Sequence, residues 1–143
     1  MDRDEFEMLR DLPGKEIADD IVYRTDKNLP LGVFRTDQVK VDNSLEYPVV
    51  VEGHYTQATG AVVFNFFLEG TGPICRFEVN STIHGEAGRT HKHDLRTPRC
   101  PLQNLPSATA RPDMERLGPK ELWELICRHT KIIFTGRFEF PGG

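Results

Sequence analysis

Apolar residues recur at helical spacing near both ends of the chain and follow strand-like patterns between them. Residues 2–12 carry apolar side chains at intervals of three, an aspartate near the start suits a helix cap, and Pro13-Gly14 ends the pattern. Pro119 suits the first position of a second helix, whose apolar stripe runs through residues 120–129. The pattern therefore predicts one helix near each end.

The middle of the chain is rich in β-branched and aromatic residues, divided by turn residues. The nearly continuous apolar segment 61–69 predicts a central strand covered on both faces. In residues 74–79, alternation places Arg76 and Glu78 on one face and Cys75 and Phe77 on the other. The expected strands are 21–25, 33–41, a hairpin of 47–57 with 61–69, then 74–79, a return strand within 89–95, and 131–140 with a bulge at Gly136.

Four prolines in residues 97–118 predict an extended surface connection. The order helix, strands, helix, strand is typical of the α+β class. We expect a mostly antiparallel sheet with an N-terminal helix and a C-terminal helix packed on it. With 143 residues, no internal repeat and no linker, the chain is predicted to form a single globular domain over 1–143.

Composition narrows the class of protein. An apolar fraction of 38% with nine phenylalanines argues for a packed core, and the net charge of −4 argues against broad non-specific nucleic-acid binding while leaving room for a local basic patch. Cys75, Cys100 and Cys127 form an odd set without a CxxC pair, which favours a reducing compartment. No apolar run reaches membrane-spanning length and the acidic start is unlike a signal peptide, so we expect a cytoplasmic protein with no membrane partner.

Candidate chemistry is concentrated in residues 84–100, HGEAGRTHKHDLRTPRC, which hold three of the five histidines. If residues 90–95 are extended, His91 and His93 project from one face, whereas Lys92 and Asp94 point the other way. The basic residues of the stretch are Arg89, Lys92, Arg96 and Arg99.

The first interpretation of this stretch is metal-free cleavage of RNA. A neutral imidazole can take a proton while a charged one supplies it, so His91 and His93 are the candidate catalytic pair. Cations stabilise the negative charge that develops on phosphate, and the planar arginine fork bonds two phosphate oxygens at once. The candidate substrate-binding residues are therefore Arg89, Lys92, Arg96 and Arg99.

The second interpretation is a metal site. His84, His91 and His93 would supply three nitrogen ligands, the number that catalytic zinc sites often use, and Asp94, Cys100 or Glu86 would complete a closed site. The surrounding positive charge works against a dication, which places this interpretation behind the metal-free one.

A third interpretation is a solvated polar loop in which the histidines satisfy backbone groups. His54, in a predicted strand, is an additional candidate if the fold brings it to the cluster.

The run FEVN-STIHGEAGRTHKHDL resembles a segment of the TumE-type family of small bacterial toxin–antitoxin proteins. In that family an aspartate-asparagine pair precedes a histidine-rich HHKH-like run. The resemblance matches His91, Lys92 and His93 to the end of that run and Asn80 to the asparagine, whereas Glu78-Val79 departs from the aspartate. It implies a bacterial toxin acting on RNA, with a cognate antitoxin as partner.

A looser resemblance covers more of the chain. It is to an uncharacterised bacterial or phage family with an acidic first helix, a strand-rich middle, an H-x-H element near Pro and Cys, and a final helix ending near Cys and two isoleucines. Together the patterns favour a toxin–antitoxin or phage-defence protein, a metal-independent ribonuclease with no cofactor. The alternatives are a non-catalytic protein-interaction module and a zinc-dependent hydrolase.

Overall fold

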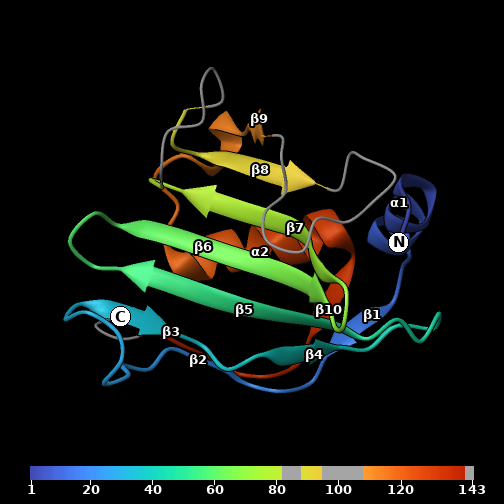
Figure 1. Ribbon diagram of the computed structural model, residues 1–143, viewed down its shortest axis with the longest axis horizontal. Coiled ribbons are helices and arrows are strands. Elements are labelled where there is room, and N and C mark those ends of the chain that lie inside the picture. Colours follow the sequence, from blue (N-terminus) through green and yellow to red (C-terminus); the bar gives the residue numbers. More distant parts are fainter. Residues whose placement is uncertain (82–87, 95–107, 141–143) are drawn as a thin grey trace.

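The computed structural model of the chain describes residues 1–81, 88–94 and 108–140. Two α-helices accompany a large sheet and two small strand pairs (Figure 1). In chain order the elements are α1 Arg3–Asp11, β1 Lys15–Ile17, β2 Ile21–Val22, β3 Val33–Arg35, β4 Val39–Val41, β5 Val49–Thr56, β6 Ala61–Leu68, β7 Gly72–Val79, β8 His91–Asp94, β9 Ala108–Ala110, the 3₁₀ turn η2 Pro112–Met114, α2 Pro119–Thr130, β10 Ile132–Phe134 and β11 Phe138–Glu139.

The large sheet has seven strands, all paired antiparallel, in the order β3-β5-β6-β7-β8-β9, with β4 paired to the first half of β5. The predicted α+β class with a mostly antiparallel sheet and a helix near each end is therefore confirmed. None of the helices in the described ranges is long and apolar enough to cross a membrane.

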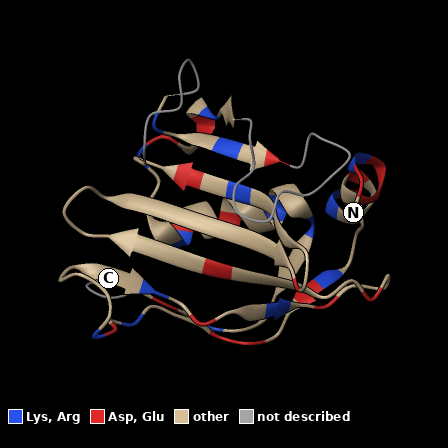
Figure 2. Ribbon diagram, in the orientation of Figure 1, with Lys and Arg blue, Asp and Glu red and all other residues tan. Residues whose placement is uncertain are grey.

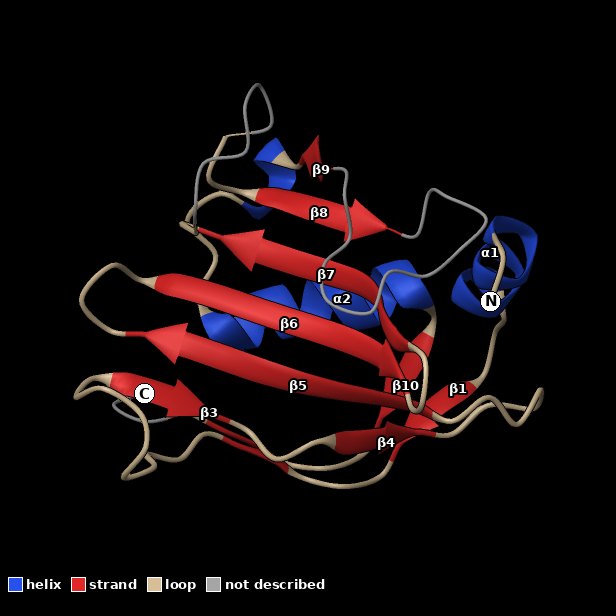
Figure 3. Ribbon diagram, viewed as in Figure 1, coloured by secondary structure: helices blue, strands red, loops and turns tan. Residues whose placement is uncertain are grey.

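The hydrophobic core lies between the large sheet and α2, which runs behind the strands (Figure 3). Leu122, Trp123 and Ile126 of α2 are fully buried, and the Trp123 ring packs against Phe64 of β6 at 5.2 Å between centroids. Burying each such side chain contributes about 1.5–3 kcal/mol. Strand β6 lies in the middle of the sheet, as predicted, and alternate residues are buried while the others are half-buried, so its second face is covered only in part.

Helix α1 is held at both ends by polar contacts. Asp2 is the aspartate that caps the helix, and with Glu5 it forms a reciprocal capping box that was not predicted. At its end the ammonium group of Lys15 donates to the carbonyl oxygens of Leu9, Arg10 and Leu12 at 2.6–2.8 Å, satisfying groups that the helix leaves unpaired. Burial lowers the pKa of Lys15 to about 8.

Three predicted strands are shorter or divided, and the first, 21–25, is reduced to the two residues of β2. The segment 33–41 forms β3 and β4, separated at Thr36, whose hydroxyl accepts a hydrogen bond from the backbone N–H of Gly53 at 2.8 Å. The segment 131–140 forms β10 and β11, because the chain at Gly136 passes so close to Asp19 that a Cβ would overlap its carbonyl oxygen. These two strands pair in parallel with β1 and β2, and β1 was not predicted.

The proline-rich connection falls partly within the described residues. Residues 97–107 lie outside them, and 108–118 contain β9 and η2, where Met114 is fully buried. The return strand expected within 89–95 is β8, paired with β7. Figure 2 shows charged residues side by side on β7 and β8, whereas β6 carries none. The candidate residues therefore meet on β7 and β8.

Candidate functional site

Strand pairing brings a glutamate beside the two predicted histidines. In the antiparallel register of β7 and β8, Glu78 lies opposite His91 and Arg76 lies opposite His93. Residues directly opposite each other project from the same face of a sheet. His91 and His93 share that face, as the alternation predicts, with their ring centroids 4.8 Å apart.

The imidazole nitrogens of both histidines lie close to one carboxylate oxygen. Oε2 of Glu78 lies 2.7 Å from Nε2 of His91 and 2.9 Å from Nε2 of His93. One candidate ligand atom from each of these three residues can be chosen so that all lie within 4.8 Å of one another. All three residues are buried, with His91 fully enclosed. We call Glu78, His91 and His93 the His-His-Glu cluster.

Neighbouring polar groups orient the carboxylate of Glu78. The hydroxyl of Ser81 donates to Oε1 at 2.8 Å, and Nε of Arg76 donates to Oε2 at 3.1 Å. Burial by itself would raise the pKa of Glu78, but the hydrogen bonds from His93 and Ser81 and the positive charges of Arg76 and His91 outweigh it and hold the pKa well below its usual range. The cluster therefore carries an ionised carboxylate at neutral pH.

The tautomer of His91 is determined by a backbone carbonyl that contacts the other nitrogen of the ring. Nδ1 of His91 lies 3.0 Å from the carbonyl oxygen of Gly88, and because a carbonyl only accepts, this nitrogen carries a proton. In neutral imidazole, Nε2 then presents its lone pair toward Glu78. A lone pair that faces a carboxylate at 2.7 Å is unfavourable without positive charge, which is supplied either by a second proton on His91 or by a metal ion beside both atoms.

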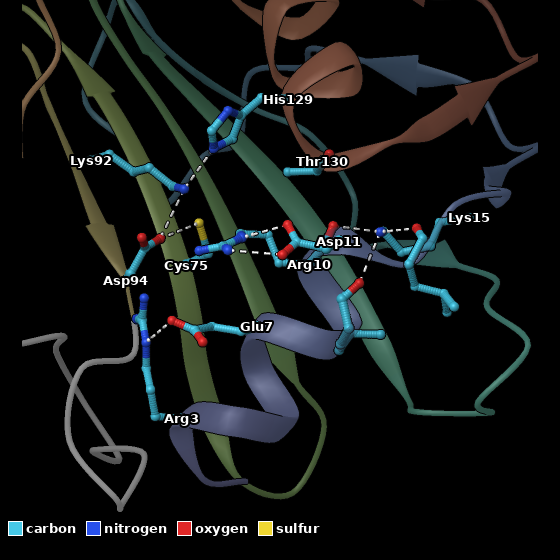
Figure 4. Close-up of polar contacts among 12 residues, drawn as sticks. Arg3, Glu7, Arg10, Asp11, Lys15, Cys75, Lys92, Asp94, His129 and Thr130 are labelled. Carbon is cyan, nitrogen blue, oxygen red and sulfur yellow. Dashed lines mark hydrogen bonds and ion pairs between the residues drawn. The ribbon is translucent and has the colours of Figure 1, made fainter.

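Lys92 and Asp94 project from the opposite face of β8, toward α2 and α1 (Figure 4). The ammonium group of Lys92 donates to Nε2 of His129 at 2.9 Å and lies 3.1 Å from Asp94, and the thiol of Cys75 donates to Asp94 at 3.3 Å. Lys92 also lies over the Phe77 ring at 5.1 Å. The ammonium group proposed to bind substrate phosphate therefore points away from the two histidines.

Burial and positive charge act on this second network. Burial, with the charges of Lys92 and Arg111, lowers the pKa of His129 to about 4, so its ring is neutral and accepts from Lys92. Burial also raises the pKa of the Cys75 thiol, which argues against a nucleophilic thiolate there. The network fastens β8 to the end of α2.

The remaining predicted residues are spread over several places. Arg89 is exposed and Asn80, at the end of β7, donates its backbone N–H to Thr90 at 3.3 Å. His54 lies on β5, on the same face as the cluster but separated from β7 by β6, and contacts Glu52 at 3.2 Å. Three candidates, His84, Arg96 and Arg99, and the suggested metal ligands Glu86 and Cys100 lie outside the described residues.

Glu78 is the functional residue that sequence reasoning missed. From the sequence it is a departure from the aspartate of the resembling toxins and is not expected to contact the two histidines. The alternation of residues 74–79 already places Glu78 on one face with Arg76, but only the register of β7 against β8 brings it to His91 and His93. Asp94, proposed as a completing ligand, projects from the other face of β8.

Comparison of the chain with models of known protein families, with curated proteins and with solved structures gives no match. The assignment of a function therefore depends on the geometry of the His-His-Glu cluster.

Proposed function

We propose that the protein binds one divalent transition-metal ion through Glu78, His91 and His93 and uses it for hydrolysis. The observation that carries this proposal is the approach of Nε2 of both histidines to one carboxylate oxygen of Glu78, at 2.7 Å and 2.9 Å. Two histidines and a carboxylate are a donor set of catalytic zinc sites, and they also suit iron(II). Three protein ligands leave a position on the ion for water, whose pKa such an ion lowers toward neutrality.

The surroundings of His91 support ligation by Nε2. Metal-bound histidines commonly donate their other ring N–H to a carbonyl or carboxylate, which fixes the tautomer, and the Gly88 carbonyl occupies this position. Ser81 holds the second oxygen of Glu78 in the same way. Arg76 opposes a dication by its charge and competes for Oε2, so we expect moderate rather than extreme affinity.

Titration calorimetry on chelator-treated protein tests the proposal. We expect one zinc ion per chain, and loss of at least tenfold in affinity in Glu78→Gln, which keeps the side-chain shape and removes the negative charge. Glu52→Gln is the matched control. Glu52 also contacts a histidine, His54, on the same face of the sheet, but neither residue belongs to the group of possible metal ligands found among the described residues. Binding that is absent from the parent, or equal in parent and Glu78→Gln, contradicts the proposal.

A second candidate function is the metal-free cleavage of RNA by His91 and His93. The observation in its favour is their position on one face, with ring centroids 4.8 Å apart. Against it, both Nε2 atoms are directed at the protein's own carboxylate and not at a common open space. Cleavage of RNA that persists in excess chelator and is lost in His93→Gln favours this function over the metal-dependent one. A toxin–antitoxin role stays a prediction, and co-purification of an antitoxin from the native host tests it.

A further inference from the structure

A surface hollow lies at the end of the β7–β8 pair. Its lining comes from three segments, namely the end of β7, the residues before β8, and the connection between η2 and α2. The lining residues are Asn80, Arg89, Thr90, Glu115 and Arg116.

The hollow and the His-His-Glu cluster share the same chain segments. Ser81, which bonds Glu78, donates its backbone N–H to the carbonyl of Arg89 at 2.9 Å. Gly88, whose carbonyl binds Nδ1 of His91, immediately precedes Arg89. A ligand that occupies the hollow therefore lies beside the residues that orient the cluster.

Two arginine side chains in the hollow are exposed and have no carboxylate partner among the described residues. Within residues 1–81, 88–94 and 108–140, no acidic side chain lies within 4.0 Å of the guanidinium of Arg89 or Arg116. Two other exposed arginines, Arg35 and Arg137, are paired with carboxylates, whereas Arg89 and Arg116 lie together in one hollow without such a pair among the described residues. Glu115 is the acidic residue of the lining, so the two arginines outnumber it.

The backbone in the hollow is also unusual. Asn80 has a φ of 53° and Arg116 a φ of 63°, both in the left-handed region. Asparagine tolerates this region, whereas arginine there costs about 1 kcal/mol. Such strain is found most often where a side chain is positioned for function.

We propose that this hollow binds a phosphate group of a nucleic-acid strand at the surface, beside the chain segments that orient the buried His-His-Glu cluster. The planar guanidinium fork matches phosphate oxygens, so the two arginines of the lining are the groups that would hold the phosphate. The net charge of −4 repels polyanions from most of the protein surface. A nucleic-acid strand therefore needs a local group of positive charges to bind, and the two exposed arginines supply one. This inference rests on the proposed hydrolytic function and gives it a substrate class.

Fluorescence anisotropy with labelled single-stranded RNA and DNA 12-mers tests the inference on the whole protein. We expect Arg89→Gln and Arg116→Gln each to weaken binding about fivefold, and the double variant to lower the slope of log affinity against log salt by about one. Arg24→Gln is the matched control, an exposed arginine away from the hollow, and should change affinity less than about twofold. Absence of 12-mer binding, or equal binding by parent and double variant, overturns the inference.

Two further arms separate the possible sources of failure. If inorganic phosphate competes with the 12-mers at equal molar concentration, the hollow is a site for free phosphate and the inference is wrong; competition that needs at least a hundredfold excess supports a strand. Binding is measured with chelator present and also in Glu78→Gln. Because Glu78 does not line the hollow, arginine-dependent binding that survives both conditions supports the inference even where the metal proposal fails.

Discussion

Replacing Glu78 by glutamine in metal-free protein should cost a large share of the stability of the fold. The carboxylate side chain is only 8% exposed and lies 2.7 Å from His91, 2.9 Å from His93 and 3.1 Å from Arg76. Glutamine preserves the volume but leaves the half-buried guanidinium of Arg76 without this partner charge. Removing one member of a buried ion pair costs about 3–5 kcal/mol, and because the introduced amide can still hydrogen-bond to its neighbours we expect about 2–4 kcal/mol.

The corresponding fall in melting temperature follows from chain length. An unfolding entropy of about 2.1 cal/mol/K per residue gives about 0.3 kcal/mol/K for this chain, so a loss of about 3 kcal/mol lowers the melting temperature by about 10 °C. Urea titration followed by near-UV circular dichroism measures the free energy of unfolding, with chelator present so that no metal contributes. Glu52→Gln, at a half-buried pair with His54, should cost less than about 1 kcal/mol. If both substitutions cost the same, Glu78 is not the charged centre of a buried cluster.

Two further predictions concern the fold. The lowered pKa of His129, about 4, means that the unfolded chain binds more protons between pH 6.5 and 4, so stability falls as the pH falls through this window. Because only part of the His129 side chain is buried and solvent screens the rest, we expect less than about 1 kcal/mol. His129→Gln, which still accepts from Lys92, should flatten that dependence in urea titrations at about pH 7 and about pH 4.5. Gly136→Ala should destabilise by more than about 2 kcal/mol through overlap with Asp19, whereas Gly118→Ala, with no atom nearby, should cost less than about 1 kcal/mol.

Periodicity predicted the helices and strands whose buried face follows from the spacing of their own apolar residues. The hairpin of β5 and β6, the first helix with Asp2 at its cap, and the shared face of His91 and His93 all follow from the spacing of side chains along one element. Periodicity does not indicate which strand pairs with which. The parallel pair of β1 with β10 joins segments more than a hundred residues apart, and its three-residue strands have no pattern of their own.

The same limit explains why the candidate site was only half predicted. Alternation placed Arg76 and Glu78 on one face of β7, and it separated Lys92 from the two histidines. The distance between Glu78 and His91 depends on register across two strands, which the sequence alone leaves open. Arg116 was missed for the same reason. It lines the hollow together with Arg89, but it comes from the connection between η2 and α2, which is distant in sequence from the histidines.

Nitrogen-15 NMR of the histidine side chains during zinc addition shows which rings bind the ion. We expect one equivalent of zinc to shift Nε2 of His91 and of His93 to metal-bound values, while Nδ1 of His91 remains protonated and hydrogen-bonded to the Gly88 carbonyl. The nitrogen-15 chemical shifts of the His54 and His129 rings should not change on zinc addition. Zinc-dependent shifts at His54 or His129 in place of the cluster, or no shift at His91 and His93, would contradict the assignment of Glu78, His91 and His93 as a metal site.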